Sequence, residues 1–114
     1  MSETIFDKII RQQLPAEIVY EDEAVLAFRD ISPQAPIHVL VIPRQKVEHL
    51  EAFAKEDAAT VGRFFQKVAA IAQKLGLSTT GYRVVLNQGN HGGQTVAYLH
   101  AHILGGREMQ WPPG

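Results

Sequence analysis

The chain has 114 residues and a formal net charge of −1, because its 11 Lys and Arg nearly balance its 12 Asp and Glu. This balance argues against a broadly basic nucleic-acid-binding protein. The chain contains no cysteine, which excludes disulfides, thiolate metal sites and cysteine nucleophiles. No apolar run reaches the about 18 residues of a membrane span, and the N-terminus lacks the pattern of a signal peptide. We expect one cytoplasmic domain over residues 1–114 that binds neither nucleic acid nor a membrane.

The N-terminal part of the chain predicts a short helix followed by a hairpin. Thr4 can cap the helix, and Pro15 limits its length. The apolar side of this helix contains Ile5, Phe6, Ile9 and Ile10. Residues 18–20 and 25–28 are apolar and flank a polar turn, which is typical of two hairpin strands.

The middle of the chain predicts a buried strand and then a long helix. The β-branched run at residues 37–42 indicates a central strand that Pro43 ends. A helix is expected over about residues 56–75, because apolar residues recur there at spacings of three and four. Its predicted buried face contains Val61, Phe64, Phe65, Val68, Ile71, Ala72 and Leu75. Gly76 suits a left-handed cap at the end of this helix.

The C-terminal part predicts two strands around a polar, glycine-rich loop. The strands are expected at residues 82–86 and 96–104, and the loop at residues 87–95. One long helix between strands that look antiparallel predicts an α+β fold.

The last predicted strand places two histidines on one face. Side chains alternate along a strand, so one apolar face, expected to pack on the long helix, contains Ala97, Leu99, Ala101 and Ile103. The opposite face contains Val96, Tyr98, His100, His102 and Leu104. His100 and His102 therefore point the same way, about 7 Å apart along the strand.

Three interpretations of this histidine pair remain open from the residues alone. The histidines can be structural and hydrogen-bonded, or they can be two ligands of a metal whose third ligand is His38 or His91. They can also act as a nucleophile or as an acid and base on a phosphoryl group, because imidazole is mostly neutral near pH 7. The preceding loop has three glycines, whose N–H groups can surround anionic oxygens, and this favours phosphate binding.

Several separated stretches of the chain share their order and residues with one known family. They are Ile5-Phe6, Lys8-Ile9-Ile10, Leu14-Pro15-Ala16, Tyr20-Glu21-Asp22, Leu26-Ala27-Phe28, the run from Asp30 to Pro36, the run from His38 to Pro43, Gly81-Tyr82-Arg83, Asn87, Gly92-Gly93-Gln94, Leu104-Gly105-Gly106-Arg107 and Trp111-Pro112-Pro113-Gly114. Together they resemble the histidine-triad (HIT) superfamily, in its Hint branch of nucleotide-binding phosphoramidases. The resemblance covers nearly the whole chain.

The signature of this family is three histidines that alternate with apolar residues. The corresponding stretch here reads Tyr98-Leu99-His100-Ala101-His102-Ile103-Leu104, so Tyr98 replaces the first histidine. The resemblance implies that His100 is the nucleophile and that His38 supports it. Tyr98 can still make one hydrogen bond through its hydroxyl, from a longer side chain. Thr95 stands where serine is usual and keeps the hydroxyl.

The resemblance implies a metal-independent hydrolase without a cofactor that cleaves the P–N bond of purine nucleoside 5′-phosphoramidates. A covalent nucleotidyl-histidine would form on His100, with a backbone carbonyl holding its Nδ1–H. The implied catalytic residues are His100, His102, His38 and Thr95. The implied residues around a purine nucleoside monophosphate or phosphoramidate are Ile5, Phe6, Ile9, Phe28, Asp30, Ile31, Asn87, Gly93, Gln94, Thr95, Val96, His100 and His102. The alternative is a nucleotide-binding or regulatory module with little catalysis because of Tyr98.

The resemblance also implies the architecture and assembly of the protein. We expect a HIT-like antiparallel sheet with one long helix and a short N-terminal helix. We further expect a homodimer with a continuous sheet, in which Trp111 of one subunit reaches the neighbouring site. His49 and His91 match no family site, and both are expected at the surface.

Overall fold

The structure is a computed structural model, and it describes residues 3–114. These residues form one five-stranded antiparallel sheet with the strand order β1-β2-β3-β5-β4. The strands are β1 (Ile18–Glu21), β2 (Val25–Arg29), β3 (Ile37–Pro43), β4 (Tyr82–Val85) and β5 (Ala101–Gly105). The helices are α1 (Ile5–Ile10), the 3₁₀ helix η1 (Leu50–Lys55), α2 (Ala58–Lys74) and the short α3 (Gly89–Gly92). The predicted α+β class is confirmed.

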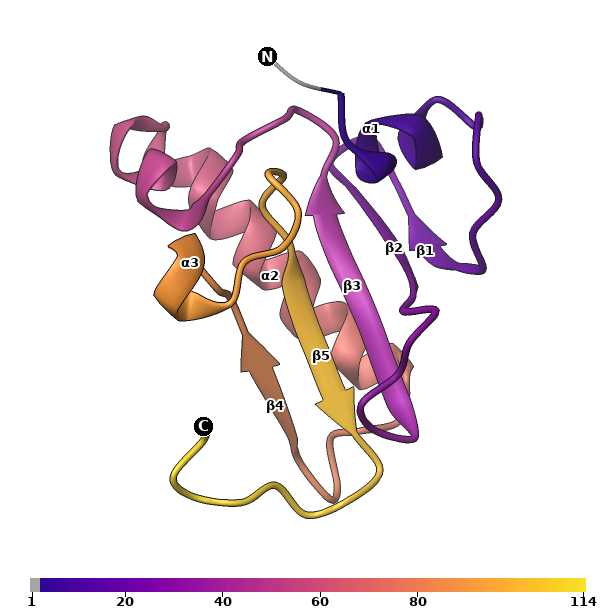
Figure 1. Ribbon diagram of the computed structural model, residues 1–114. Helices are drawn as coiled ribbons and strands as arrows, with labels where there is room; N and C mark the ends of the chain where they lie inside the picture. The colour runs from indigo at the N-terminus through magenta and orange to yellow at the C-terminus, as the bar shows by residue number, and fades with distance from the viewer. Residues whose placement is uncertain (1–2) are drawn as a thin grey trace.

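The two faces of the sheet are covered by different helices, as Figure 1 shows for α1 and α2. Because strand side chains alternate, β3 contributes to both cores: Val39 and Val41 belong to one, and Leu40 and Ile42 to the other. The first core lies between the sheet and α2 and also contains Phe64, Val68, Ile71, Ala72, Ala101 and Ile103. The second core lies under α1 and contains Phe6, Leu26, Phe28 and Tyr98.

Both predicted helices form where their capping residues indicate. The Asp57 side chain accepts hydrogen bonds from the main-chain N–H groups of Ala59 and Thr60, so α2 begins two residues later than expected. Gly76 follows the helix with a φ of 80° and is the predicted left-handed cap. At α1, Thr4 and Asp7 form a reciprocal capping box.

One residue of the predicted buried face of α2 is exposed. Phe65 has 39% of its surface accessible, whereas its neighbour Phe64 has 4%. Successive helical residues point about 100° apart, so only one of the two rings can face the sheet. Phe65 instead packs edge-on against Phe64 and Phe53, with ring centroids 5.4 and 6.1 Å away.

The last strand is shorter than predicted, because it begins at Ala101 instead of residue 96. Its neighbour β3 ends in Pro43, which has no N–H to donate, and the register of the pair would place Pro43 opposite Leu99. The segment of residues 96–100 therefore lies outside the ladder. Leu99 and Tyr98 still point into opposite cores as the alternation predicts, but Ala97 is exposed, so its placement against the long helix was wrong.

Two short helical segments in residues 3–114 were not predicted. Helix α3 lies inside the glycine-rich loop, and η1 precedes α2. Each is held by turns of backbone hydrogen bonds without a side-chain cap, so no capping residue in the sequence marks it. None of the helices in the described part of the chain is both long and apolar enough to span a membrane.

Candidate active site

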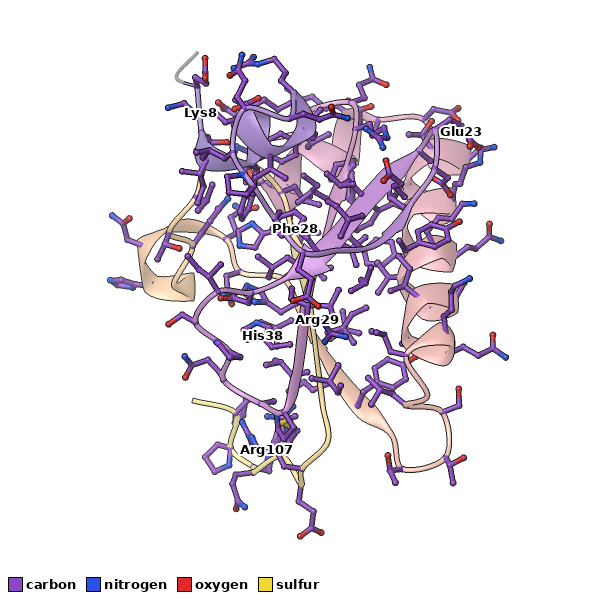
Figure 2. The ribbon with its side chains drawn as sticks, turned by 90° about the vertical axis from the view of Figure 1, so that its right-hand side faces the viewer. Lys8, Glu23, Phe28, Arg29, His38 and Arg107 are labelled. Carbon is purple, nitrogen blue, oxygen red and sulfur yellow. The ribbon has the colours of Figure 1, made fainter. Side chains whose placement is uncertain are left out.

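Three histidines meet on the α1 side of the sheet. His38 belongs to β3, His102 to the neighbouring β5, and His100 immediately precedes β5. His38 Nε2 lies 2.9 Å from His102 Nδ1, and the ring centroids of His100 and His102 are 4.9 Å apart. In Figure 2, His38 lies between the level of Phe28 and that of Arg107, within the body of the molecule. The structure thus brings His38 together with His100 and His102.

The hydrogen bonds of His38 and His102 fix which nitrogen carries each proton. The main-chain N–H of Gln34 donates to His38 Nδ1 over 3.0 Å. A neutral imidazole has one N–H, so His38 must carry its proton on Nε2 and donate it to His102 Nδ1. The proton of His102 is therefore on Nε2, where it is available to an acceptor outside the protein.

His100 has the opposite arrangement. Its Nδ1 lies 2.6 Å from the main-chain carbonyl oxygen of Tyr98, which can only accept a hydrogen bond. His100 Nδ1 therefore carries the proton, and its Nε2 has a free lone pair. A backbone carbonyl, as expected, lies beside His100 Nδ1. Side by side, His100 and His102 offer one nucleophilic nitrogen and one N–H donor.

Burial keeps this cluster neutral. His38 and His100 are 5% and 7% exposed, and burial lowers the pKa of both imidazoles. The negative charge of Asp30 opposes this at His38, and the hydrogen bond to the Tyr98 carbonyl, followed by Asp30, opposes it at His100. Burial also lowers the pKa of His102 to about 4, with the two neighbouring histidines adding to the effect. All three rings are therefore uncharged at pH 7, as the tautomers require.

Asp30 lies directly beside the histidines. Its Oδ1 accepts a hydrogen bond from the main-chain N–H of Ser32 at 2.8 Å, and its Oδ2 lies 3.5 Å from His38 Nε2. The carboxylate is 18% exposed. It can therefore accept hydrogen bonds from a ligand while it stays next to the cluster.

Asp30, His38 and His102 also resemble a three-ligand metal site, because their ligand atoms all lie within 4.8 Å of one another. The proton positions do not fit this interpretation. His38 Nδ1 accepts the Gln34 N–H, so His38 Nε2 must keep its proton and has no lone pair for a metal. The 2.9 Å between His38 Nε2 and His102 Nδ1 is a hydrogen-bond length.

The five apolar residues assigned to a base-binding slot divide into two groups. Phe6 and Phe28 are each 3% exposed, and their rings pack edge to face at 5.5 Å within the α1 core. Ile5 and Ile31 are 50% and 97% exposed, and Ile9 is partly buried against that core. The isoleucines thus offer accessible apolar surface, whereas the phenylalanines lie beneath it.

The glycine-rich loop is held by one of its own side chains. Gln94 Nε2 donates to the carbonyl oxygens of Glu48 and Val96, and Gln94 Oε1 accepts the N–H of Gly89. This carboxamide, predicted to contact substrate, is thus engaged within the protein. Gly93 ends α3 with a φ of 82°.

The other predicted loop contacts differ in how accessible they are. Thr95 is exposed, and Asn87 is partly buried. Val96 packs against the α1 core. Thr95 is thus the accessible hydroxyl beside the histidine segment.

Two residues that form an ion pair beside Tyr98 were missed from the sequence. Lys46 lies 5.7 Å from the ring centroid of Tyr98 and makes a 2.9 Å ion pair with Asp7 of α1. Lys46 belongs to no motif, Asp7 belongs only to the capping box of α1, and their separation along the chain hides the pairing. The hydroxyl of Tyr98 donates to the carbonyl oxygen of Pro43.

The remaining singled-out residues lie outside the cluster. His91 is exposed, as predicted. The surface placement of His49 was wrong: this residue is partly buried, and its Nδ1 is an inaccessible atom without a hydrogen-bond partner. Its position at the N-cap of η1, a helix absent from the prediction, explains the difference. Trp111 is 81% exposed and lies 6.0 Å from the Arg83 guanidinium.

Comparison with known proteins agrees with this geometry. The HIT domain family matches the sequence of this chain over residues 11–109. An uncharacterized HIT-like protein of Synechococcus elongatus is 56% identical over the full length of both chains. A 14 kDa zinc-binding protein of Zea mays is 50% identical, covering 99% of this chain and 89% of that one.

Solved structures agree as well. A HIT family hydrolase from Legionella pneumophila superposes with a TM-score of 0.92 and 43% identity, covering 98% of this chain and all of that one. A histidine triad protein from Clostridium difficile gives a TM-score of 0.87 and 38% identity, covering 96% and 97% of the two chains. The α+β fold is thus that of known HIT structures, and the chain belongs to the HIT family.

Proposed function

We propose that this protein is a purine nucleotide-binding hydrolase that cleaves the P–N bond of nucleoside 5′-phosphoramidates. The observation that carries the proposal is the arrangement of His100, a neutral, buried imidazole whose Nδ1–H is held by the Tyr98 carbonyl. This leaves Nε2 as a nucleophile with a fixed direction. The likeness to structures described as HIT family hydrolases supports hydrolytic chemistry.

In the first step, the lone pair of His100 Nε2 forms a bond to phosphorus as the P–N bond to the amine breaks. The leaving nitrogen takes up a proton from water, relayed through the exposed hydroxyl of Thr95. The product is a covalent nucleotidyl-histidine, and its imidazolium is stabilised by the Nδ1–H bond to the Tyr98 carbonyl.

His102 acts on the phosphoryl oxygens. Its Nε2–H is a donor because His38 occupies its Nδ1. Loop N–H groups would add further donors, apart from those of Gly89, Gly93 and Gln94, which bond within the loop. These groups stabilise negative charge on the phosphoryl oxygens in the transition state. In the second step, a water oxygen attacks phosphorus and its proton passes to the solvent, which replaces the proton used in the first step. The bond to His100 breaks, His100 becomes neutral again, and the nucleoside monophosphate leaves.

The same residues support nucleotide binding. The Asp30 carboxylate lies beside the cluster and can accept hydrogen bonds from ribose hydroxyls. The accessible surfaces of Ile5, Ile9 and Ile31 would provide apolar contacts for a purine, as the resemblance implies. Asn87, Gly93, Thr95 and Val96 would line the ribose and phosphate. This scheme uses no metal or cofactor.

The test measures amine release from adenosine 5′-phosphoramidate, with and without a chelator. We expect turnover that the chelator does not change. His100→Ala should abolish turnover and retain adenylate binding, whereas His91→Ala, at an exposed histidine, should keep full activity. Turnover in His100→Ala would contradict the nucleophile, and loss of activity in chelator with recovery in zinc would contradict the metal-independent scheme.

A second candidate is a nucleotide-binding or regulatory module with little catalysis. It is favoured by the Tyr98 hydroxyl, which bonds to Pro43 and does not extend the hydrogen-bond chain of the histidines. The two functions differ in their kinetics. A burst of amine equal to the enzyme concentration, followed by almost no turnover, would identify the module.

A further inference from the structure

The Tyr98 side chain is hydrogen-bonded to the end of β3, beyond the last residue pair that joins β3 to β5. Tyr98 is 1% exposed, and its hydroxyl donates to the carbonyl oxygen of Pro43 at 2.5 Å. Pro43 cannot donate an N–H, so the segment of residues 96–100 has no regular pairing with β3. The phenol therefore makes a cross-strand hydrogen bond from a side chain, next to the carbonyl that holds His100 Nδ1.

An ion pair holds the ring of Tyr98 from another side. The Lys46 ammonium lies 5.7 Å from the ring centroid and 2.9 Å from Asp7 Oδ2. Both charged side chains are largely buried, with 17% and 16% of their surface exposed. Burial acts to raise the pKa of Asp7, but hydrogen bonds from the Thr4 main chain and from Lys46 outweigh it and lower that pKa to about 2.

Phe6 connects this ion pair to the nucleophile. Phe6 precedes Asp7 in α1, and its ring lies edge-on to both His100 and Tyr98, with centroids 5.0 and 6.1 Å away. The position of α1 therefore determines the aromatic wall that Phe6 forms beside the His100 ring. Lys46, Asp7, Phe6 and Tyr98 form a continuous set of contacts that ends at His100.

We propose that Tyr98, together with Lys46 and Asp7, is a positioning unit that fixes the carbonyl and the ring wall that orient His100. The inference rests on the proposed function, in which His100 Nε2 is the nucleophile. The side chain at position 98 touches neither substrate nor phosphorus in this scheme. The Tyr98 side chain acts by holding the main-chain carbonyl of Tyr98 against the Nδ1–H of His100. Loss of the side-chain hydroxyl should therefore change the chemical step more than substrate binding.

The decisive variant is Tyr98→Phe, which removes only the hydroxyl and keeps the ring against Phe6 and Lys46. We expect kcat to fall by about tenfold while KM changes less than about twofold. The matched control is Tyr20→Phe, which removes another phenol hydroxyl, bonded to Asp22 on the other face of the sheet. The control should lose stability without changing kcat.

A spectroscopic measurement tests the positioning without using turnover. In ¹⁵N-labelled wild-type protein, we expect His100 Nδ1 to have the chemical shift of a protonated nitrogen and Nε2 that of an unprotonated one. In Tyr98→Phe, the two shifts should approach each other, because the carbonyl no longer holds one tautomer. Tyr20→Phe should leave both shifts unchanged.

Variants at the other end of the unit keep the test independent of any one substitution. Lys46→Met removes the ammonium and keeps an unbranched stem, so it should change kcat and the His100 shifts in the same direction as Tyr98→Phe. Lys46→Arg keeps the charge toward Asp7 and a group that stacks on the ring, and it should restore both. Failure of this rescue would contradict the role of the ion pair.

The outcomes separate this inference from the proposed function. Wild-type protein without phosphoramidate turnover would overturn the proposed function, and the His100 shifts would still decide whether Tyr98 orients the ring. Normal wild-type turnover, with kcat and His100 shifts unchanged in Tyr98→Phe and Lys46→Met, would overturn the positioning unit alone.

Discussion

Two main-chain groups set the protonation of the histidine cluster. The Gln34 N–H at one end fixes the tautomers of His38 and His102, and the Tyr98 carbonyl at the other end fixes that of His100. These hydrogen bonds and the burial of the rings determine which nitrogen of each histidine carries the proton. His102 is consequently a donor and His100 an acceptor, although both are the same residue type on the same face.

The depressed pKa of His102 predicts a loss of stability in acid. The unfolded chain binds a proton on this ring near pH 6.5, whereas the folded protein binds it only near pH 4. As the pH falls between these values, the unfolded state takes up a proton that the folded state does not. The contribution of His102 to stability is therefore complete above about pH 6.5 and is lost as the pH falls through about 4.

Urea unfolding at pH 7 and at pH 4.5 tests this linkage. We expect His102→Gln to lose less unfolding free energy than wild type between the two pH values, because glutamine does not titrate. His91→Gln, at an exposed histidine, should behave like wild type. An equal loss in His102→Gln and wild type would mean that His102 has an ordinary pKa in the folded protein.

At the scale of elements, the sequence predicts those helices and strands whose positions depend on neighbouring residues in the chain. The spacing of apolar residues locates α2, and Asp57 and Gly76 mark its ends. The hairpin of β1 and β2 and the central strand β3 also lie within two residues of their predicted positions. The start of β5 was missed because it depends on Pro43 in a different strand, with which residue 99 would have to pair.

The candidate site depends on longer-range pairing. Alternation predicts that His100 and His102 share a face, but only the β3–β5 register brings His38 beside them. The sequence supplied that third histidine through resemblance to a family. The contacts of Lys46 with Asp7 and Tyr98 have no local signal, because three segments must fold together before they form.

Two glycines differ in the space available for an added side chain. A Cβ on Gly105, at the end of β5, would lie 2.6 Å from Leu77 Cδ2, and Leu77 is 5% exposed and closely packed. Gly105→Ala should therefore reduce stability by about 1–3 kcal/mol, through overpacking. A Cβ on Gly62, on the exposed side of α2, meets nothing within 4 Å, so Gly62→Ala should increase stability by about 0.5–1 kcal/mol.

Chemical unfolding of the two alanine variants beside wild type measures both effects. The pair controls for the substitution itself, since each variant adds one methyl group at a glycine. Wild-type stability in Gly105→Ala would show that Leu77 moves aside without loss. A destabilised Gly62→Ala would show that this side of α2 is covered in solution.

At the scale of the whole molecule, one face of the sheet packs on α2 and the other face contains the histidine cluster. The larger core lies under α2, and the histidines lie on the face that α1 covers. Substitutions in the α2 core should mainly change stability. Substitutions around α1 should change activity as well, because Phe6 belongs both to that core and to the wall of His100.

The expected homodimer would form through one of the two edge strands of the sheet. In the sheet formed by residues 3–114, β1 and β4 are the outer strands. An exposed edge presents unpaired N–H and C=O groups, and pairing with a second copy satisfies them. The resemblance to the Hint branch implies such a continuous sheet. We expect β4 to be the edge that pairs, because Tyr82 and Val84 are 39% and 37% exposed there, next to the tail that contains Trp111.

Light scattering after size-exclusion chromatography tests this assembly with one variant at each edge. Wild-type protein at micromolar concentration should have twice the chain mass of 12.6 kDa. Val84→Lys should give the monomer mass, because a buried, unpaired ammonium strongly opposes association. Ile18→Lys places the same charge on β1, at a residue that is 40% exposed, and should remain dimeric. A monomeric wild type would contradict the dimer, and the reverse behaviour of the two variants would assign the contact to β1.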